Sequence, residues 1–270
     1  MEKFIKIDIE TNSSERLEIL IAELSDINFY AFEQNNNVLI AYIKEENFDQ
    51  PQFHEALCGE VYKSAIIENR NWNQEWERGV EPVYIKKFAG IRASFHQPLR
   101  SVKHEIIITP KMSFGTGHHA TTYLMIEQME EINFRNKKVL DFGTGTGILA
   151  ILAEKLGAKE VLAIDNDEWS INNALENLKA NNCKQIFLGK KDDVTEIVPQ
   201  DIILANINLN VLIQNASNIS SISHKGTLLI MSGFLFEDET KILSSFNTIG
   251  FVKKTMVNRN DWMSLSMNKK

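Results

Sequence analysis

The feature that most constrains this chain is a glycine-rich turn between an apolar run and a helical pattern. Residues 139–150 read Val-Leu-Asp-Phe-Gly-Thr-Gly-Thr-Gly-Ile-Leu-Ala, and an acid, Asp165, ends the next apolar run. Glycine tolerates a positive φ and has no Cβ, so a ligand can approach its backbone, and the helix that follows offers unpaired amides. A strand, a close-contact turn and a helix in this order predict a nucleoside-binding α/β sheet.

The spacing of the glycines limits which class of ligand the turn can bind. Ile148 stands where the pattern G-x-G-x-x-G has its third glycine, so a pyrophosphate on the helix terminus is not favoured and a ligand without phosphates fits better. A carboxylate at Asp165 can accept both hydroxyls of a ribose lying at the strand end. The alternative is an ordinary strand–turn–helix unit in which the glycines only tighten the turn and Asp165 caps a helix.

The length of 270 residues predicts one large or two smaller domains. Because 43% of the residues are hydrophobic, the chain can bury a core, and we expect a soluble globular protein. Only Cys58 and Cys183 occur, which is too few for a disulfide framework and favours a reducing compartment. The amino terminus lacks an apolar signal region, and no apolar run approaches the ~20 residues that cross a bilayer. We therefore expect a cytoplasmic protein with no membrane partner.

The net charge of −7 is concentrated at the front of the chain, where the first 60 residues hold four Lys and Arg against thirteen Asp and Glu. An acidic surface repels nucleic acid and attracts basic polypeptides, so we expect a basic protein partner and no direct nucleic-acid contact. The alternative is that these acids only solubilise the surface.

Two domains and a connector follow from the pattern of elements. Residues 1–68 alternate as β-α-β-β-α-β, which is the ferredoxin-like α+β order. Residues 69–110 are expected to form a connector helix, with Trp72 and Trp76 at i, i+4 spacing, and extra strands. Residues 111–270 alternate strands with helices, including one helix over 209–219, which predicts a doubly wound parallel sheet. Turn-prone residues 258–261 predict an antiparallel hairpin at its edge.

Three predicted segments converge at the carboxyl ends of the strands, where open α/β sheets bind ligands: the glycine turn, Asp165 and Asn206. An asparagine just past a buried strand offers a carbonyl acceptor and an amide donor, which can hold an amine with its lone pair aimed at an electrophile. Its alternative role is the N-cap of the helix that begins near Leu209.

A polar, turn-rich segment over residues 111–122 precedes the sheet and is expected to form one wall of the pocket. It contains the adjacent histidines His118 and His119. Neighbouring residues on a helix point in different directions, and no cysteine or carboxylate stands at ligand spacing. We therefore expect no metal site.

Two motifs carry a resemblance to a known family. Residues 141–147, Asp-Phe-Gly-Thr-Gly-Thr-Gly, resemble the first motif of the class I S-adenosylmethionine-dependent methyltransferases, which have a Rossmann-like doubly wound sheet. Residues 114–122, Phe-Gly-Thr-Gly-His-His-Ala-Thr-Thr, resemble the F-G-T-G-x-H-x-T-T signature of the family that methylates ribosomal protein eleven of the large subunit (PrmA type). The similarity spans nearly the whole chain, including the N-terminal ferredoxin-like module.

The resemblance implies a protein N-methyltransferase whose cofactor is S-adenosylmethionine and whose first domain binds the basic ribosomal protein. The methylated groups would be lysine ε-amines and an N-terminal α-amine. It implies cofactor contacts from Thr122, Gly143, Gly145, Asp165 and Asn206, with Phe114 and His119 lining the same pocket. The rival functions are a methyltransferase for another protein, a small amine or nucleic acid, and a noncatalytic ribosome-associated binder.

Two departures from related patterns bear on the substrate. Thr109-Pro110-Lys111 replaces the usual D-P-G lead-in to the signature loop. Asn206 is followed by Ile207 and no proline, which argues against the N-P-P-[YF] enzymes that act on glutamine or nucleobase amines.

A sulfonium carries its own leaving group, so the protein must chiefly align a neutral amine and exclude water. We hypothesise that Asn206 positions the amine, with His119 as the runner-up general base, and that the protein is a monomer.

Overall fold

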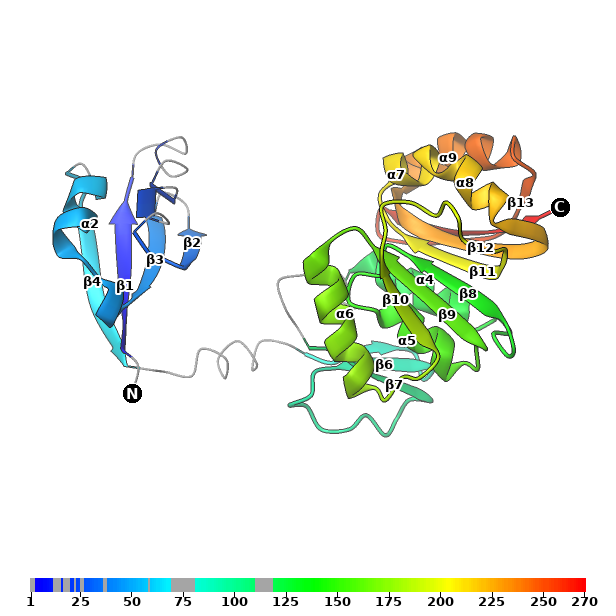
Figure 1. Ribbon diagram of the computed structural model, residues 1–270, viewed down its shortest axis with the longest axis horizontal. Coiled ribbons are helices and arrows are strands. Elements are labelled where there is room, and N and C mark those ends of the chain that lie inside the picture. The colour runs from blue at the N-terminus through cyan, green and yellow to red at the C-terminus, as the bar shows by residue number, and fades with distance from the viewer. Residues whose placement is uncertain are drawn as a thin grey trace. The chain divides into compact units, whose positions relative to one another are not determined.

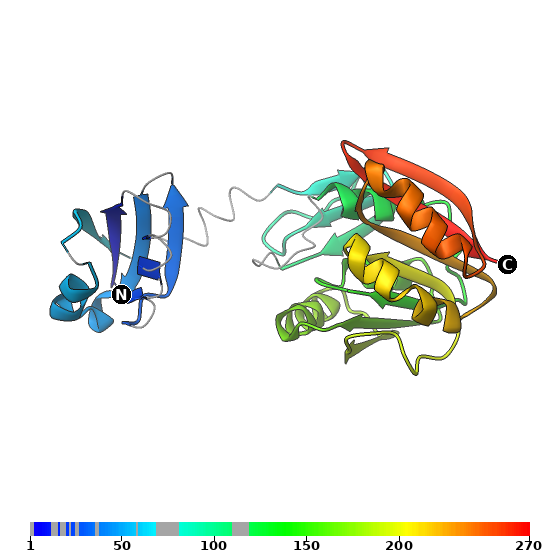
Figure 2. The ribbon, with the colours of Figure 1, turned by 90° about the horizontal axis from the view of Figure 1, so that it is seen from above.

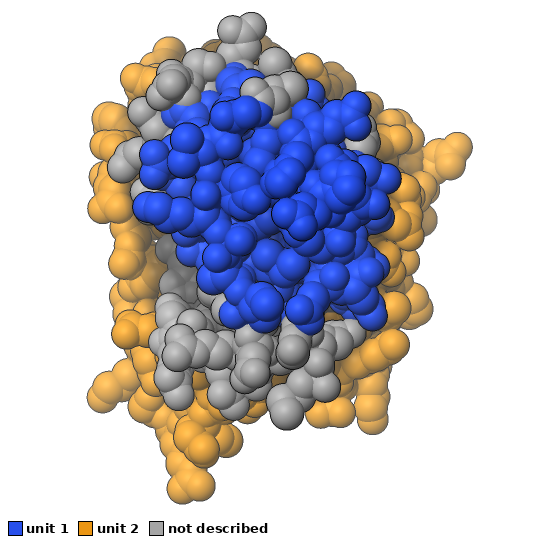
Figure 3. All heavy atoms as spheres, turned by 90° about the vertical axis from the view of Figure 1, so that its left-hand side faces the viewer, with its two compact units in different colours: residues 1–79 blue, residues 80–270 orange. Residues whose placement is uncertain are grey.

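The computed structural model describes residues 3–11, 16, 20, 21, 23, 24, 27–35, 38–57, 59–68, 81–109 and 119–270. The chain forms two compact units, Met1–Gly79 and Val80–Lys270, which are coloured separately in Figure 3. The predicted Trp72/Trp76 connector helix and the signature residues Phe114 and His118 lie outside the described residues. None of the helices in these described ranges is long and apolar enough to cross a membrane.

The smaller unit is an antiparallel sheet with helices packed on one side. Its strands follow the order β2-β3-β1-β4, which is the ferredoxin-like arrangement expected from the sequence. Alternate residues of β1, such as Ile5, Ile7 and Ile9, are buried against helical Leu20 and Leu24 and against Phe53. The elements are β1 (Lys3–Glu10), β2 (Ala31–Asn35), β3 (Val38–Lys44), the short helix η1 (Glu45–Asn47), α2 (Gln50–Leu57) and β4 (Tyr62–Glu68).

The larger unit is built on a seven-stranded sheet in the order β10-β9-β8-β11-β12-β14-β13. The first five strands in this order are mutually parallel, and β14 is antiparallel to both of its neighbours. The strands are β8 (Lys138–Phe142), β9 (Glu160–Asp165), β10 (Ile186–Lys190), β11 (Gln200–Asn206), β12 (Ser223–Leu235), β13 (Phe251–Arg259) and β14 (Trp262–Lys269).

Helices cover both faces of this sheet, as the predicted doubly wound architecture requires (Figures 1 and 2). One face carries α4 (Ala120–Met129), α5 (Ile148–Lys155) and α6 (Glu168–Ala180). The other carries α7 (Leu209–Gln214), α8 (Ala216–Ser221), the short helix η2 (Phe236–Asp238) and α9 (Glu239–Asn247). Successive residues of each strand point into opposite layers; for example, Leu204 of β11 joins the α4–α5 core and Ile203 joins the α7–α9 core.

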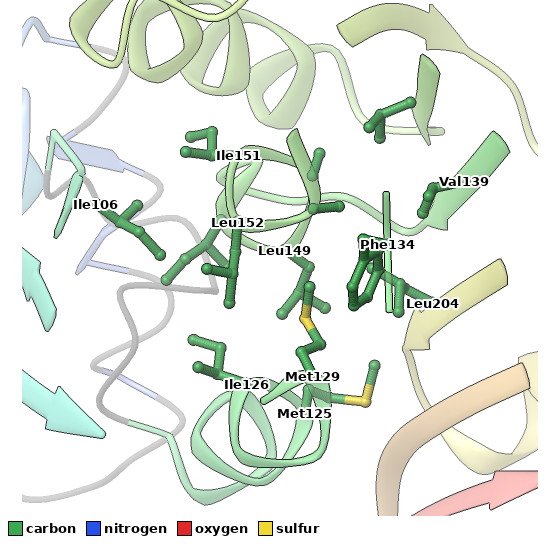
Figure 4. Packing of buried hydrophobic residues seen from close by; sticks show 14 of the residues in the cluster. Ile106, Met125, Ile126, Met129, Phe134, Val139, Leu149, Ile151, Leu152 and Leu204 are labelled. Carbon is green, nitrogen blue, oxygen red and sulfur yellow. The ribbon is translucent and has the colours of Figure 1, made fainter. Parts of the chain in front are cut away.

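A hydrophobic core packs α5 against α4 on one face of the sheet. Figure 4 shows Leu149 and Leu152 of α5 facing Met125 and Met129 of α4, with Phe134 beside them. All five side chains are buried, with exposed fractions of 4% or less. This packing positions the amino end of α5, and therefore the glycine turn before it.

A small second sheet joins the larger unit. It has the order β5-β6-β7, with strands β5 (Val83–Ile85), β6 (Ala89–Arg92) and β7 (His104–Ile107). Ile85, Ile91 and Ile106 are buried in the same core as α4 and α5. These strands fall within the compact unit Val80–Lys270, while domain boundaries at 68 and 110 stay predictions.

One local prediction needs correction, and one is confirmed. The helix expected over 209–219 is two helices, because Asn215 ends α7 with its side-chain amide donating to the Val211 carbonyl (3.0 Å) and begins α8. The predicted antiparallel hairpin at the edge of the sheet is confirmed: β13 is the outermost strand, and β14 lies between it and β12.

Candidate active site

A cleft of about 490 Å³ opens at the carboxyl ends of the parallel strands. It brings together five of the residues singled out from the sequence, namely His119, Gly143, Gly145, Asp165 and Asn206. Further lining comes from residues that the sequence reasoning did not select: Thr121, Phe142, Asn166, Ser170, Lys191, Asp192, Ile207, Asn208, Val211, Gly233 and Trp262. Thr122 lies behind this wall, fully buried.

The glycine turn has the backbone that its sequence predicts. Gly143, Gly145 and Gly147 have φ of +74°, +53° and +80°, a region that side chains rarely adopt. The amides of Gly143 and Thr144 both donate to the Ile164 carbonyl at 2.9 Å, which ties the turn to the neighbouring strand. The turn therefore presents bare backbone to the cleft.

Asp141, at the end of β8, is fully buried behind the turn. Its Oδ2 accepts hydrogen bonds from Thr144 Oγ1 (2.6 Å) and from the amide of Ala150 (3.1 Å) in the first turn of α5. A protein carboxyl group thus already occupies the amino end of this helix, the place where a dinucleotide fold receives a pyrophosphate. This agrees with a ligand that has no phosphates.

Burial raises the pKa of Asp141 from its ordinary value of 3.8 to about 7. The folded carboxyl therefore keeps a proton that the unfolded chain releases above pH ~4. The bound proton stabilises the fold at acid pH, and this stabilisation is lost as the pH rises from about 4 to about 7. We expect the free energy of unfolding of Asp141→Asn, relative to the natural sequence, to rise by roughly 2–4 kcal/mol between pH 5 and pH 8. Urea unfolding at several pH values measures it, and a difference independent of pH would contradict it.

Asp165 faces the cleft from the end of β9. Its Oδ2 accepts from the amide of Gly145 (2.8 Å) and its Oδ1 from the amide of Asp167 (3.1 Å). A carboxylate has about four acceptor sites, so two remain for a ligand. The alternative that Asp165 caps the next helix is wrong, because Asp167 is the N-cap of α6 and accepts from the amide of Ser170 (2.9 Å).

Asn206 faces the cleft from the end of β11. Its Nδ2 donates to Thr122 Oγ1 at 3.3 Å, whereas its Oδ1 is buried and has no hydrogen-bond partner among the described residues. The N-cap of α7 is Asn208, whose side chain accepts from the amide of Val211 (3.0 Å), so the capping alternative for Asn206 is wrong. An unsatisfied buried acceptor costs about 1–3 kcal/mol, and a ligand that donates a hydrogen bond to this oxygen would recover that free energy.

His119 forms the N-cap of α4. Its Nδ1 accepts from the amide of Thr121 at 3.3 Å and lies 2.8 Å from Thr121 Oγ1. The ring packs edge-on against Trp262, with the two ring centroids 4.7 Å apart. In the neutral ring an accepting Nδ1 leaves the proton on Nε2, which makes that nitrogen a donor and not a base.

The residues missed from the sequence reach the cleft from distant segments. Trp262 follows the hairpin turn and Gly233 interrupts β12, and neither has a local motif. Lys191 and Asp192 directly follow β10, so the rule that ligands bind at the carboxyl ends of parallel strands could have found them.

Comparison with known proteins identifies the family. The family model described as "Ribosomal protein L11 methyltransferase (PrmA)" matches residues 6–270. Proteins named ribosomal protein L11 methyltransferase from Porphyromonas gingivalis and Chlorobaculum parvum are 39% and 38% identical, over 92% and 93% of this chain and 89% and 92% of theirs. A crystal structure of ribosomal protein L11 methylase from Lactobacillus delbrueckii subsp. bulgaricus superposes with a TM-score of 0.66 at 29% identity, covering 71% of this chain and all of that one. The family and class I fold expected from the motifs are thus confirmed, and this chain belongs to the ribosomal protein L11 methyltransferase (PrmA) family as an S-adenosylmethionine-dependent methyltransferase.

Proposed function

We propose that this chain transfers methyl groups from S-adenosylmethionine to lysine ε-amines and the N-terminal α-amine of ribosomal protein L11. The observation that carries the proposal is the buried Oδ1 of Asn206, which has no hydrogen-bond partner in the part of the chain that the structure describes, and which belongs to the same cleft as the glycine turn and Asp165. A nucleoside fits the turn and the carboxylate, and an N–H donor fits the amide oxygen. The names of the relatives at 30–39% identity support L11 as the acceptor.

The residues of the cleft fit the methyl donor. Asp165 would accept the ribose hydroxyls, the bare backbone of Gly143 and Gly145 would lie against the nucleoside, and Thr122 would act through Asn206. Phe114 stays a prediction from the signature loop. When bound, S-adenosylmethionine supplies a methyl on a positively charged sulfur, which leaves as a neutral thioether.

The chain must then present a neutral amine in line with that methyl. Asn206 Oδ1 would accept one N–H of the amine, which turns the nitrogen lone pair toward the methyl carbon. The ammonium of a lysine, with an ordinary pKa of ~10.4, loses its proton to water more readily as it enters a partly desolvated cleft. One N–C bond forms while one S–C bond breaks, and the product amine releases its extra proton to solvent.

Because Nδ1 of His119 caps α4, we expect this residue to orient the cleft wall instead of taking the proton. His119→Ala should lower kcat less than about tenfold, compared with the 10²–10⁴-fold that a general base supplies. Its pH–rate profile should keep the midpoint of the natural enzyme. Initial rates from pH 6 to pH 10 measure this, and an alkaline shift confined to the histidine variant would instead assign the base to His119.

The charge distribution supports a basic client. Thirteen acids against four bases in the first 60 residues suit a lysine-bearing ribosomal protein better than RNA, so we infer no direct nucleic-acid contact. Monomeric action in the cytoplasm belongs to the same proposal.

Mass spectrometry of intact proteins tests the function. The purified enzyme and S-adenosylmethionine are incubated with a mixture of unmodified large-subunit ribosomal proteins and, separately, with ribosomal RNA. The mass of one or more methyl groups should be added to L11 alone. Transfer to another protein or to RNA would show that L11 is not the substrate. If the donor binds and no methyl is transferred, the protein is a noncatalytic binder.

A further inference from the structure

We infer that Gly233, in β12, is a positioning residue for methyl transfer: its missing side chain lets the peptide of Ile207 seat against β12, which aims the carboxamide of Asn206 into the cleft. The inference rests on the proposed role of Asn206. Gly233 lines the cleft but belongs to none of the motifs that define the donor site.

The position of β11 between two neighbours explains the arrangement. In the sheet, β11 lies between β8 and β12, and Asn206 pairs with Ser232, the residue before Gly233. The chain leaves β11 through Ile207, so this residue must pass between the carboxyl ends of both neighbours. Each neighbour has a glycine at the point of passage.

The space for Ile207 exists only because both positions lack a Cβ. A Cβ built on Gly233 would lie 2.2 Å from the carbonyl oxygen of Ile207, 2.6 Å from its carbonyl carbon and 3.2 Å from its nitrogen. A Cβ on Gly143 would lie 2.2 Å from Cγ2 of Ile207. The contact at Gly233 is with backbone, so no rotamer change at Ile207 relieves it.

The backbone of β12 is shaped for this contact. Gly233 has φ of +101°, and the pairing of β12 with β14 shifts register between Ser232 and Phe234, as in a β-bulge. The bulge therefore places a glycine of positive φ directly against the backbone of Ile207, the residue after Asn206.

Displacement of that peptide should reach the carboxamide. The bond from Asn206 Nδ2 to Thr122 Oγ1 is already 3.3 Å long, so a shift of a few tenths of an ångström breaks it and frees the amide to turn. Misplacement of a positioning group by about 1 Å costs about 10²-fold in rate.

The test compares two glycines of the same strand. Gly226 in β12 has φ of +93° and nothing within 4 Å of its built Cβ, so Gly226→Ala carries the backbone strain without the contact. Gly233→Ala should lower kcat for L11 methylation about 10- to 100-fold relative to Gly226→Ala. In an Asn206→Ala background, Gly233→Ala should lower kcat by less than about twofold, because its effect passes through Asn206.

Each result separates this inference from the proposed function. Equal kcat for the two alanine variants, or a full multiplicative loss in the Asn206→Ala background, would overturn the inference while the natural enzyme still methylates L11. If the natural enzyme transfers no methyl, the proposed function fails instead. Ile207→Gly, which needs no extra space and loosens the same peptide, should also lower kcat, and it decides the matter if Gly233→Ala does not fold.

Discussion

Replacing Asp165 with alanine is expected to lower the affinity for S-adenosylmethionine by about 10²- to 10⁴-fold. Hydrogen bonds to a charged group contribute about 1.5–3 kcal/mol each, two ribose hydroxyls would lose theirs, and 1.4 kcal/mol is a factor of ten. The variant also frees the amide of Gly145, which now donates to Asp165 Oδ2 at 2.8 Å, so the turn itself loses a restraint. Isothermal titration calorimetry with the donor measures the effect.

Asp167→Ala is the matched control, because this carboxylate stands two residues away and caps α6 without lining the cleft. Its loss should cost about 1 kcal/mol of stability, as the loss of an N-cap does, and leave donor affinity unchanged. Equal losses of affinity in both variants would contradict the assignment of Asp165 to the ribose.

Asn206→Ala is expected to lower kcat by about 10²- to 10³-fold at saturating donor and L11, because the amine would lose its orienting acceptor. The buried Oδ1 has no partner among the described residues, so its removal relieves an unsatisfied acceptor and the fold should not weaken through that atom. Single-turnover rates with saturating enzyme measure the chemical step apart from product release.

Asn208→Ala removes an asparagine from the same loop and serves as the comparison. Its side chain accepts from the amide of Val211 at the start of α7, so the expected effect is a loss of about 1 kcal/mol in unfolding free energy. The loss of kcat should be much smaller than for Asn206→Ala. A kcat for Asn206→Ala within threefold of the natural enzyme would remove the amide from the reaction.

The strongest predictions from sequence came from residues whose chemistry is local. Three glycines within five positions require a left-handed turn, and the alternation of apolar runs with helical patterns requires a parallel sheet. Together they place the ends of β8, β9 and β11 at one edge, which is where Asp165 and Asn206 lie.

Sequence alone could not choose between neighbouring caps. Asp165 and Asp167 have the same capping chemistry, as do Asn206 and Asn208, and in each pair the second residue is the cap because its backbone is extended at the helix start, with ψ of 125° and 154°. The first residue of each pair is thereby left for the cleft. Backbone geometry at single residues depends on the packing of the whole sheet, and a one-dimensional pattern does not record it.

The sequence also could not show which residues from distant segments reach the cleft. Trp262 reaches the cleft because β14, the inner strand of the edge hairpin, pairs with β12, and a hairpin joined to the sheet through β13 would have carried it elsewhere. The sequence of the hairpin specifies its turn and not which of its strands pairs with the sheet.

A crystal structure of the protein with S-adenosylhomocysteine, the donor without its methyl, tests the central claim most directly. The account predicts that both ribose hydroxyls lie about 2.5–3.0 Å from Asp165 oxygens. It also predicts that the sulfur faces the side of the cleft that Asn206 lines. The compound bound elsewhere, or bound here with its ribose away from Asp165, would contradict the account.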